Sequence, residues 1–463
     1  MKKDVALARY LERHIEPKLP DSPGELERWQ SVLVIPAYDE HPELLERLSK
    51  LENSGAVLVI LVLNRPDSDL DTRVNSALRD SVNRLPKIAE RRTTISRLSH
   101  SVDLFLYDLE QRCGSSPAAQ GVGLARKVGC DIALLWQSQG AISGEWIHCS
   151  DADALLPPDY FFRTENLAAA ATAVVYPFFH ARGKTDAITR ATALYELRLH
   201  YYVLGLRYAG SPYAYHTMGS CIAFKSQSYA QVRGYPKRSG GEDFYLLNKL
   251  AKTGPVISLT GQCIALQSRA SSRVPFGTGP ATGKIIRDQL GQNSLLFYHP
   301  VCFEALRVFL SVVDDLQNAP LSDLQQLLTQ GGLASDLASL AQGALAEMGL
   351  AGAIEHCRQH GKSAEQYLRH FYQWFDGFRT LKFIHAMRDG GWPMQSLAGL
   401  AGLQPQLLPL PVDAPADTET IRGSIRDQWH WAISSEEAEA TPRRKNIKVN
   451  VASASPIQSL RYE

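Results

Sequence analysis

Two hydrophobic patterns alternate in the first third of the chain. Continuous apolar runs at 31–35 and 56–63 each end at a turn that contains proline. Such runs are typical of strands that are buried on both faces of a sheet. Between them, residues 42–51 place leucines at helical spacing. Strand, helix, strand is the unit of a parallel sheet, so the pattern predicts an α/β fold.

The same unit continues further along the chain. Residues 102–107 predict a third strand, after a polar and Arg-rich crossover at about 67–100. A helix that opens at Gly121 then leads to another apolar run at 146–149. We therefore expect several buried strands whose carboxyl ends meet at one edge of the sheet, which is where α/β proteins bind ligands.

The pattern is helical at both ends of the chain. Leucines and an isoleucine recur every four residues before Pro17, and from about residue 290 the period is again helical, with a capping box at Ser363 and Gln366. Prolines after Gln404 break this period. We predict an N-terminal helical extension (1–30), an α/β domain (31–290), a helical C-terminal domain (291–403), and a linker with a flexible tail (404–463).

Composition narrows the class of protein. The chain has 463 residues and 44% apolar content, which is enough for a sizeable core. Its net charge of +1 argues against a nucleic-acid partner. Seven cysteines without metal-ligand spacing fit reduced thiols, and with no secretion signal or membrane-length apolar run visible, we expect a cytoplasmic protein. The short basic run at 443–445 could make a weak peripheral contact with anionic lipid or simply be solvated.

Candidate chemistry begins with two carboxylates one residue apart. Asp151 and Asp153 follow the strand predicted at 146–149. Alternate residues of an extended segment point the same way, and hard divalent cations accept carboxylate oxygens while keeping positions for phosphate. The pair could therefore hold one metal ion, although acids at strand ends also serve as turn and cap residues. His148 and His216 are candidates for a third ligand, with packed core histidines as the alternative.

Three other segments carry groups that suit a phosphorylated ligand. The helix that opens at Gly121 could present free amides, with Arg126 or Lys127 adding charge, or its glycines could simply make a turn. Arg269 and Arg273 lie in a Gly- and Ser-rich loop that could close over a diphosphate, or be solvated. Glu242 and Asp243 open a helix, where they could cap amides or act as a base.

Taken in order, these segments resemble the motifs of glycosyltransferase family 2. The matching elements are Pro36-Ala37-Tyr38-Asp39-Glu40, the segment from Gly121 to Gly129, the Asp-x-Asp (DXD) motif with its continuation to Pro158, Met218-Gly219-Ser220 with Arg233-Gly234-Tyr235-Pro236, and Gly241-Glu242-Asp243. The resemblance covers roughly residues 31–260. It implies the GT-A fold of nucleotide-diphospho-sugar transferases.

The resemblance implies metal-assisted transfer of a sugar from a nucleotide diphosphate to an acceptor hydroxyl, with inversion. Asp243 would be the base, Glu242 would bind acceptor hydroxyls, and Asp151 with Asp153 would hold Mg²⁺ or Mn²⁺. A uridine diphosphate sugar is favoured as donor, and the acceptor is open between a saccharide, a lipid-linked molecule and a small molecule. The residues implied or considered for donor contact are Pro36, Ala37, Tyr38, Glu40, Asn64, Arg126 and Asp151, with Lys127, Arg269 and Arg273 as phosphate contacts.

The chain also departs from the family pattern. Asn64-Arg65-Pro66-Asp67-Ser68 stands where many relatives have paired acids and Gly-Ser, which leaves the base and ribose contacts open. The Gln-x-x-Arg-Trp motif of processive synthases is absent, so we expect single additions. Two alternatives remain: a phosphohydrolase with Asp151 as nucleophile and Asp153 as acid/base, and a protein that binds nucleotide sugars without turnover.

Overall fold

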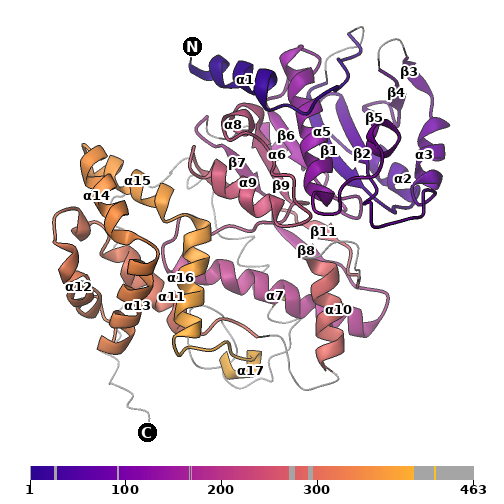
Figure 1. Cartoon of the computed structure of the whole chain (residues 1–463). Helices are drawn as coiled ribbons and strands as arrows, with labels where there is room; N and C mark the ends of the chain where they lie inside the picture. The colour runs from indigo at the N-terminus through magenta and orange to yellow at the C-terminus, as the bar shows by residue number, and fades with distance from the viewer. Residues whose placement is uncertain are drawn as a thin grey trace.

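The computed structural model describes residues 2–24, 29–90, 93–165, 167, 169–270, 277–289, 296–400 and 422–423. A large, mostly parallel sheet is flanked by helices and followed by a helical region (Figure 1). The fold class predicted from the sequence, an α/β sheet followed by a helical C-terminal region, is confirmed.

The main sheet has the strand order β10-β7-β9-β6-β1-β2-β5-β4-β3. β1 pairs in parallel with β2 and β6, while β9 runs antiparallel to both β6 and β7. β8 and β11 form a separate parallel pair. The strands are β1 (Ser31–Ala37), β2 (Val57–Leu63), β3 (Lys87–Ala89), β4 (Ile95–Arg97), β5 (Val102–Asp108), β6 (Trp146–Cys149), β7 (Ala173–Val175), β8 (Phe178–His180), β9 (Ile222–Lys225), β10 (Val256–Ser258) and β11 (Ile264–Leu266).

The two long apolar runs become the centre of the sheet. Every residue of β1 and β2 is buried, and alternate side chains enter two different cores. Val32 and Val34 pack on the face covered by α5, while Leu33 and Ile35 pack on the face covered by α2. Burial on both faces is why these strands read as continuous apolar runs. The carboxyl ends of β1, β2, β5, β6, β7 and β10 consequently meet at one edge of the sheet.

Ten helices within the described residues accompany the sheet. They are α1 (Lys2–Arg13), α2 (Glu43–Ser49), α3 (Ser76–Asn83), α4 (Leu109–Cys113), α5 (Gly121–Ser138), α6 (Phe162–Glu165), α7 (Asp186–Tyr208), α8 (Ser226–Gln231), α9 (Glu242–Leu250) and α10 (Thr278–Gln289).

The helical C-terminal region packs around a core of its own. Its elements are α11 (Pro300–Ser311), two short 3-10 helices (Asp315–Gln317 and Leu321–Asp323), α12 (Leu324–Gln330), α13 (Ser335–Glu347), α14 (Leu350–His360), α15 (Ala364–Trp374), α16 (Gly377–Asp389) and α17 (Leu397–Leu400). Leu197 and Tyr201 of α7 join this core beside Phe303 of α11. The long helix α7 thus connects the two parts, and the domain boundaries predicted from the sequence remain predictions.

No single helix in the described part of the chain has both the length and the apolar composition to cross a membrane. α13 and α14 meet those two criteria only when taken together, with a bend of 71° between them.

The N-terminal helix is held on the sheet domain by a buried carboxylate. Asp131 of α5 is fully buried. It accepts hydrogen bonds from the Tyr10 hydroxyl at 2.5 Å, the Tyr229 hydroxyl at 2.9 Å, the Glu16 amide at 2.8 Å and the Lys127 ammonium at 2.7 Å. Four donors, one of them cationic, compensate the desolvation of this charge.

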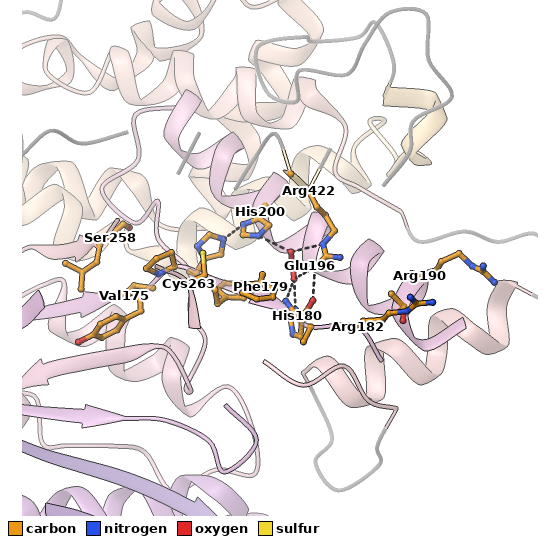
Figure 2. Close-up of a pocket in the computed structure, with 18 of the residues that line it drawn as sticks. Val175, Phe179, His180, Arg182, Arg190, Glu196, His200, Ser258, Cys263 and Arg422 are labelled. Carbon is orange, nitrogen blue, oxygen red and sulfur yellow. Dashed lines mark hydrogen bonds and ion pairs between the residues drawn. The ribbon is translucent and has the colours of Figure 1, made fainter. Parts of the chain in front are cut away.

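A cavity of about 470 Å³ lies beside α7, at the end of the sheet where β7 and β10 finish (Figure 2). Its described lining comes from the end of β7 and the segment after it, from α7, from the segment before β9, from the end of β10 and the residues after it, and from positions 422 and 423. These residues are Val175–Arg182, Asp186, Thr189, Arg190, Glu196, His200, His216, Ser258, Leu259, Cys263, Arg422 and Gly423.

We expect Asp131→Ala to lower the free energy of unfolding by roughly 3–5 kcal/mol, because it leaves the buried Lys127 ammonium with only the more distant carboxylate of Glu16, at 3.9 Å. Urea unfolding followed by circular dichroism measures this loss. Glu12→Gln is the matched control, since its ion pair with Arg13 is exposed and is worth at most about 1 kcal/mol. A loss below about 1 kcal/mol for Asp131→Ala would contradict the role given to this carboxylate.

Candidate functional site

A buried arginine joins two of the predicted motifs at the carboxyl edge of the sheet. Arg126 of α5 has a side chain only 3% exposed. Its Nη2 donates to Asp151 Oδ1 at 2.5 Å and its Nε donates to Glu242 Oε1 at 3.0 Å. Nη1 lies 3.4 Å from the carbonyl oxygen of Ser150. One guanidinium therefore connects the end of β6 with the start of α9.

Glycines make room for this arrangement. A Cβ atom at Gly219 would lie 2.6 Å from Arg126 Nη2, so a larger residue there would displace the guanidinium. Gly241, immediately before α9, has φ +71°, a conformation that favours glycine and directs Glu242 into the first helical turn. At the start of α5, the Gly123 amide donates to the carbonyl of Arg238 at 3.0 Å. Of the two readings of the Gly121 segment, this close packing favours a structural role for Gly123.

The charge on Arg126 is fixed by its neighbours. Burial opposes a positive charge, but the attraction of Asp151 and Glu242 outweighs it and raises the pKa of Arg126 well above its ordinary value. Glu242 is itself only 4% exposed. Arg126 and Glu242 form a buried ion pair, and Asp151, the third member of the cluster, has a side chain that is 40% exposed.

Asp243 is the acid of this cluster with the most perturbed titration. Burial and the neighbouring charge of Glu242 raise the pKa of Asp243 to about 7. The amide of Phe244 donates to its Oδ1 at 2.7 Å. A carboxyl group that titrates near neutral pH can take a proton from a hydroxyl at physiological pH, which is what a general base requires.

Asp153, the second aspartate of the Asp-x-Asp motif, pairs with a different arginine. Arg269 Nη2 is 2.8 Å from Asp153 Oδ2, and its Nη1 is 3.7 Å from Glu40 Oε1. Asp153 and Glu40 are 15% and 14% exposed. The structure thus brings together three predicted site residues from the end of β1, the end of β6 and the segment after β11.

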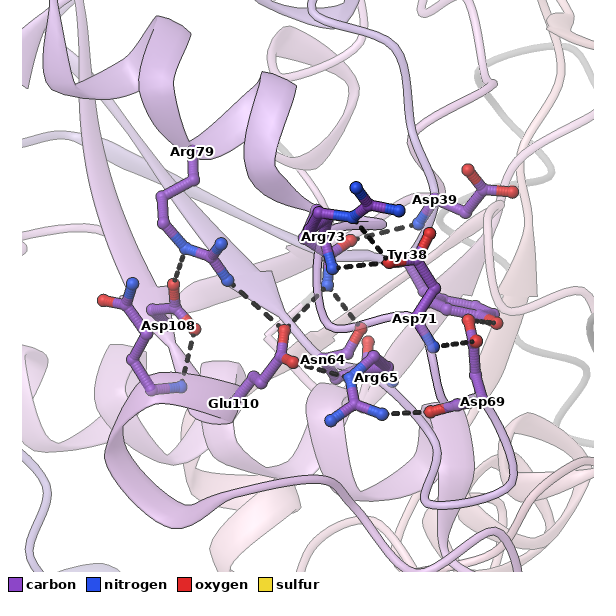
Figure 3. Close-up of polar contacts among 12 residues, drawn as sticks. Tyr38, Asp39, Asn64, Arg65, Asp69, Asp71, Arg73, Arg79, Asp108 and Glu110 are labelled. Carbon is purple, nitrogen blue, oxygen red and sulfur yellow. Dashed lines mark hydrogen bonds and ion pairs between the residues drawn. The ribbon is translucent and has the colours of Figure 1, made fainter.

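A polar network extends the edge toward β2 and β5 (Figure 3). Tyr38, after β1, donates its hydroxyl to Asp69 Oδ2 at 2.6 Å. The backbone of Asp39 has φ 55° and its amide donates to the Asn75 side chain at 3.1 Å. Asn75 also donates to the carbonyl of Asn64 at 3.1 Å. The loop after β2 is therefore tied to the segment after β1 by side chains.

The departure from the family pattern after β2 has a structural explanation. Arg65 is 9% exposed, and its Nε donates to Glu110 Oε1 at 2.5 Å. Arg79 pairs with Asp108 at 2.5 Å and with Glu110 at 3.3 Å. Arg65 thus forms an ion pair within the protein. The acid that accepts the hydrogen bond of the Tyr38 hydroxyl is Asp69, six residues after the end of β2.

Three other predicted residues lie at the same edge of the sheet, and backbone groups make the contact between them. Pro36 and Ala37 belong to β1, and the carbonyl of Ala37 accepts from the Asn64 amide at 3.0 Å. Lys127, in contrast, directs its ammonium to Asp131 at 2.7 Å and Tyr10 at 2.9 Å, so it is absent from the Arg126 cluster. Arg273 lies outside the described residues.

The two histidines considered as metal ligands have other partners. The ring nitrogens of His148 lie 3.2 Å from the carbonyl of Val32 and 3.2 Å from the Thr164 hydroxyl. His216 Nε2 is 3.0 Å from His200 Nδ1. Within the described ranges, no group of three or more His, Cys, Asp or Glu residues is arranged to hold a metal ion. Hard divalent cations commonly complete their shell with water and phosphate oxygens in addition to carboxylates.

Sequence reasoning missed Asp69 and the cluster of Glu196, His180 and Arg422. Three aspartates at alternate positions from 67 to 71 could have signalled an acidic loop beside Tyr38. For Glu196 the sequence offers only the local pair with His200, four residues along α7, because His180 and Arg422 lie 16 and 226 residues away. Only the folded chain places them together.

The chain matches no protein-family model and no curated protein. Among solved structures, its fold is similar to a fragment of S. aureus TarS in complex with UDP-GlcNAc, at 12% identity and TM-score 0.35, covering 76% of this chain and 91% of that one. It is also similar to the mannosyltransferase PcManGT from Pyrobaculum calidifontis in complex with GDP-Man and Mn²⁺, at 18% identity and TM-score 0.34, covering 84% and 96%. At these values the likenesses establish no common activity.

Proposed function

We propose that this protein is a glycosyltransferase that moves a sugar from a nucleotide diphosphate to an acceptor hydroxyl, with inversion and in single additions. The observation that carries the proposal is the buried link from Asp151 through Arg126 to Glu242, next to an Asp243 carboxyl whose pKa is raised to about 7. This link sets a candidate base beside a candidate diphosphate site at the carboxyl edge of the sheet.

Asp243 is the proposed base. It takes the proton of the acceptor hydroxyl as that oxygen attacks the anomeric carbon, and the bond from that carbon to the diphosphate breaks with its electron pair. Glu242 is bonded to Arg126 and almost fully buried. We therefore assign Glu242 to positioning Arg126 and raising the pKa of Asp243, in place of the acceptor contact expected from the family resemblance.

The departing diphosphate gains negative charge, which positive groups at the edge would stabilise. Arg269 lies against Asp153 and can exchange this contact for phosphate oxygens. Asp153 is the residue we propose to hold Mg²⁺ or Mn²⁺, with Asp151 beside it, since carboxylate and phosphate oxygens are the ligands that these ions prefer. Such an ion would neutralise charge on the leaving group.

The nucleotide would lie over the segment after β1. Tyr38 offers a ring whose hydroxyl is held by Asp69, and Glu40 lies at the same edge beside Arg269. Pro36, Ala37 and Asn64 would shape the floor through their backbone. A uridine diphosphate sugar remains the favoured donor, on the family resemblance alone.

The structure gives less support to a phosphohydrolase. A nucleophilic Asp151 would need an available carboxylate oxygen with high electron density, whereas its Oδ1 is bonded to the Arg126 guanidinium. A binding protein without turnover has no use for a carboxyl group that titrates near neutral pH beside the site. Tight nucleotide-sugar binding that Asp243→Asn leaves unchanged, with no transfer or hydrolysis by the wild type, would support the binding protein.

We expect Asp153→Ala to lose metal-dependent binding of a nucleotide sugar, because it removes the proposed cation ligand. Asp243→Asn should keep that binding and lower turnover by roughly 10²–10⁴-fold, because it removes the base. Calorimetric titration of a panel of nucleotide sugars with and without Mn²⁺, followed by release of nucleoside diphosphate, measures both quantities.

Asp159→Asn is the control for both variants. This half-exposed acid follows the Asp-x-Asp motif closely and pairs only with Arg163 among the described residues, so binding and turnover should be unchanged. If the wild-type protein binds no nucleotide sugar, the transferase proposal is wrong. Trapping of a phospho-aspartate at Asp151 would instead identify the phosphohydrolase.

The pH profile tests the base directly. Asp243 acts as a base only when it is deprotonated, and its pKa is raised to about 7. We therefore expect kcat/KM to rise about tenfold per pH unit below neutral pH and to level off above it. A profile already level from about pH 5, where an unperturbed aspartate is ionised, would contradict the assignment.

A further inference from the structure

We propose that the cavity beside α7 binds the acceptor, and that this acceptor carries a negatively charged group that Arg190 recognises. The inference rests on the proposed function, because it names the class of molecule that receives the sugar.

The cavity opens at the edge of the sheet that carries the candidate site. β7 ends at Val175 and β10 ends at Ser258, and both residues line the cavity. The amide of Tyr176 donates to the carbonyl of Cys221 at 2.8 Å, directly before β9, the strand that pairs with β6. The cavity is thus separated from the end of β6, where Asp151 stands, by the width of two neighbouring strands.

Two segments lead from the cavity to Asp243. Tyr195 precedes the cavity residue Glu196 on α7, and burial together with the charge of Asp243 raises the pKa of Tyr195 to about 12. His216 lines the cavity three residues before Gly219, whose backbone hydrogen-bonds the Asp243 carboxyl group. Asp243 itself does not line the cavity, so the proposed base lies near it, and an acceptor hydroxyl would meet the base by extending out of the cavity toward α9.

The buried carboxylate of Glu196 in the cavity wall is paired with positive and hydrogen-bonding groups. Glu196 Oε2 accepts from the amide of His180 at 2.6 Å and lies 2.8 Å from its ring Nδ1. Arg422 Nε and Nη2 donate to Glu196 at 2.9 and 3.2 Å, and Nη2 also donates to the carbonyl of His180 at 2.9 Å. Burial alone would raise the pKa of Glu196, but these contacts hold it well below its ordinary value. The opposite charges of Glu196 and Arg422 therefore neutralise each other in the cavity wall.

The other charged residues that line the cavity carry more positive than negative charge. Arg182 is paired with Asp186 at 2.8 Å, but both side chains are more than two-thirds exposed, so the pair is weak. Arg190, one helical turn after Asp186, has no hydrogen-bonding or ion-pair partner among the described residues. Figure 2 shows Arg182 and Arg190 at one end of the cavity, and Val175 and Ser258 at the other. An anionic group would bind at the arginine end.

The rest of the wall defines the body of the molecule. Phe178, Phe179 and Leu259 contribute apolar surface to the wall. The ring of Phe178 stacks against the buried ring of His200, with 5.3 Å between the ring centroids. A volume of about 470 Å³ lies in the range of small-molecule sites. The wall thus fits an elongated molecule with a ring or aliphatic body and one terminal anionic group. A phosphorylated saccharide and a lipid phosphate share this chemistry.

The test compares anionic and neutral probes of equal body. Glucose 6-phosphate is compared with glucose, and n-octyl phosphate with n-octanol, by calorimetric titration of the full chain. At least one anionic probe should bind about tenfold or more tightly than its neutral counterpart, because an arginine adds charge-assisted hydrogen bonds. Arg190→Glu should remove this preference. Arg84→Glu, an exposed arginine at the end of α3, is the matched control and should keep it.

The two anionic probes also separate the two sources. Preference for glucose 6-phosphate supports a phosphorylated saccharide, and preference for n-octyl phosphate supports a lipid phosphate. Equal binding of anionic and neutral probes, or an anion preference that survives Arg190→Glu, overturns the inference. Hydrolysis of the nucleotide sugar without acceptor is measured in parallel. If Arg190→Glu keeps this hydrolysis but loses the anion preference, the proposed function and the acceptor proposal are supported separately. If the wild type neither hydrolyses nor binds any nucleotide sugar, the proposed function fails alone.

Discussion

The arrangement of the site depends on one buried cation. Arg126 is placed in the interior by α5 and must be compensated there, because an unpaired buried charge is strongly destabilising. Its two carboxylate partners come from segments 25 and 116 residues further along the chain. The chain can satisfy Arg126 only by bringing the end of β6 and the start of α9 to the same place. We therefore regard the ion-pair cluster as a device that fixes geometry, with little net stabilisation expected from it.

That constraint explains why small residues surround it. Gly219 leaves the guanidinium its space, and Gly241 turns the backbone so that Glu242 enters the first turn of α9. Asp243 then follows with a different environment from its neighbour, since Glu242 faces the cation and Asp243 does not have it as a direct partner. Burial raises the pKa of both acids, but only Glu242 is hydrogen-bonded to the cation, a difference that the sequence Gly-Glu-Asp does not reveal.

The sequence predicted the parts of the fold that rest on local pattern. β1 and β2 follow from apolar runs buried on both faces, and Ser363 caps α15 by accepting the Gln366 amide at 3.2 Å. The three-residue strands such as β7 and β10 carry too little pattern to be read, because tertiary pairing defines them. The choice between Arg126 and Lys127 was also open, since adjacent helical residues point about 100° apart and only the neighbours decide which faces the site.

The cation also links the two halves of the proposed reaction. The charge of Glu242 raises the pKa of Asp243, and the charge of Arg126 opposes this effect. Arg126 shares its charge between Glu242 and Asp151, so a group that binds at Asp151 competes for the same guanidinium. A negative diphosphate drawn to that side would weaken the compensation of Glu242 and favour the protonated form of Asp243 further, whereas the divalent cation proposed at Asp153 would oppose this effect. The basicity of Asp243 would then depend on the presence of donor, through contacts that are already made in the folded chain.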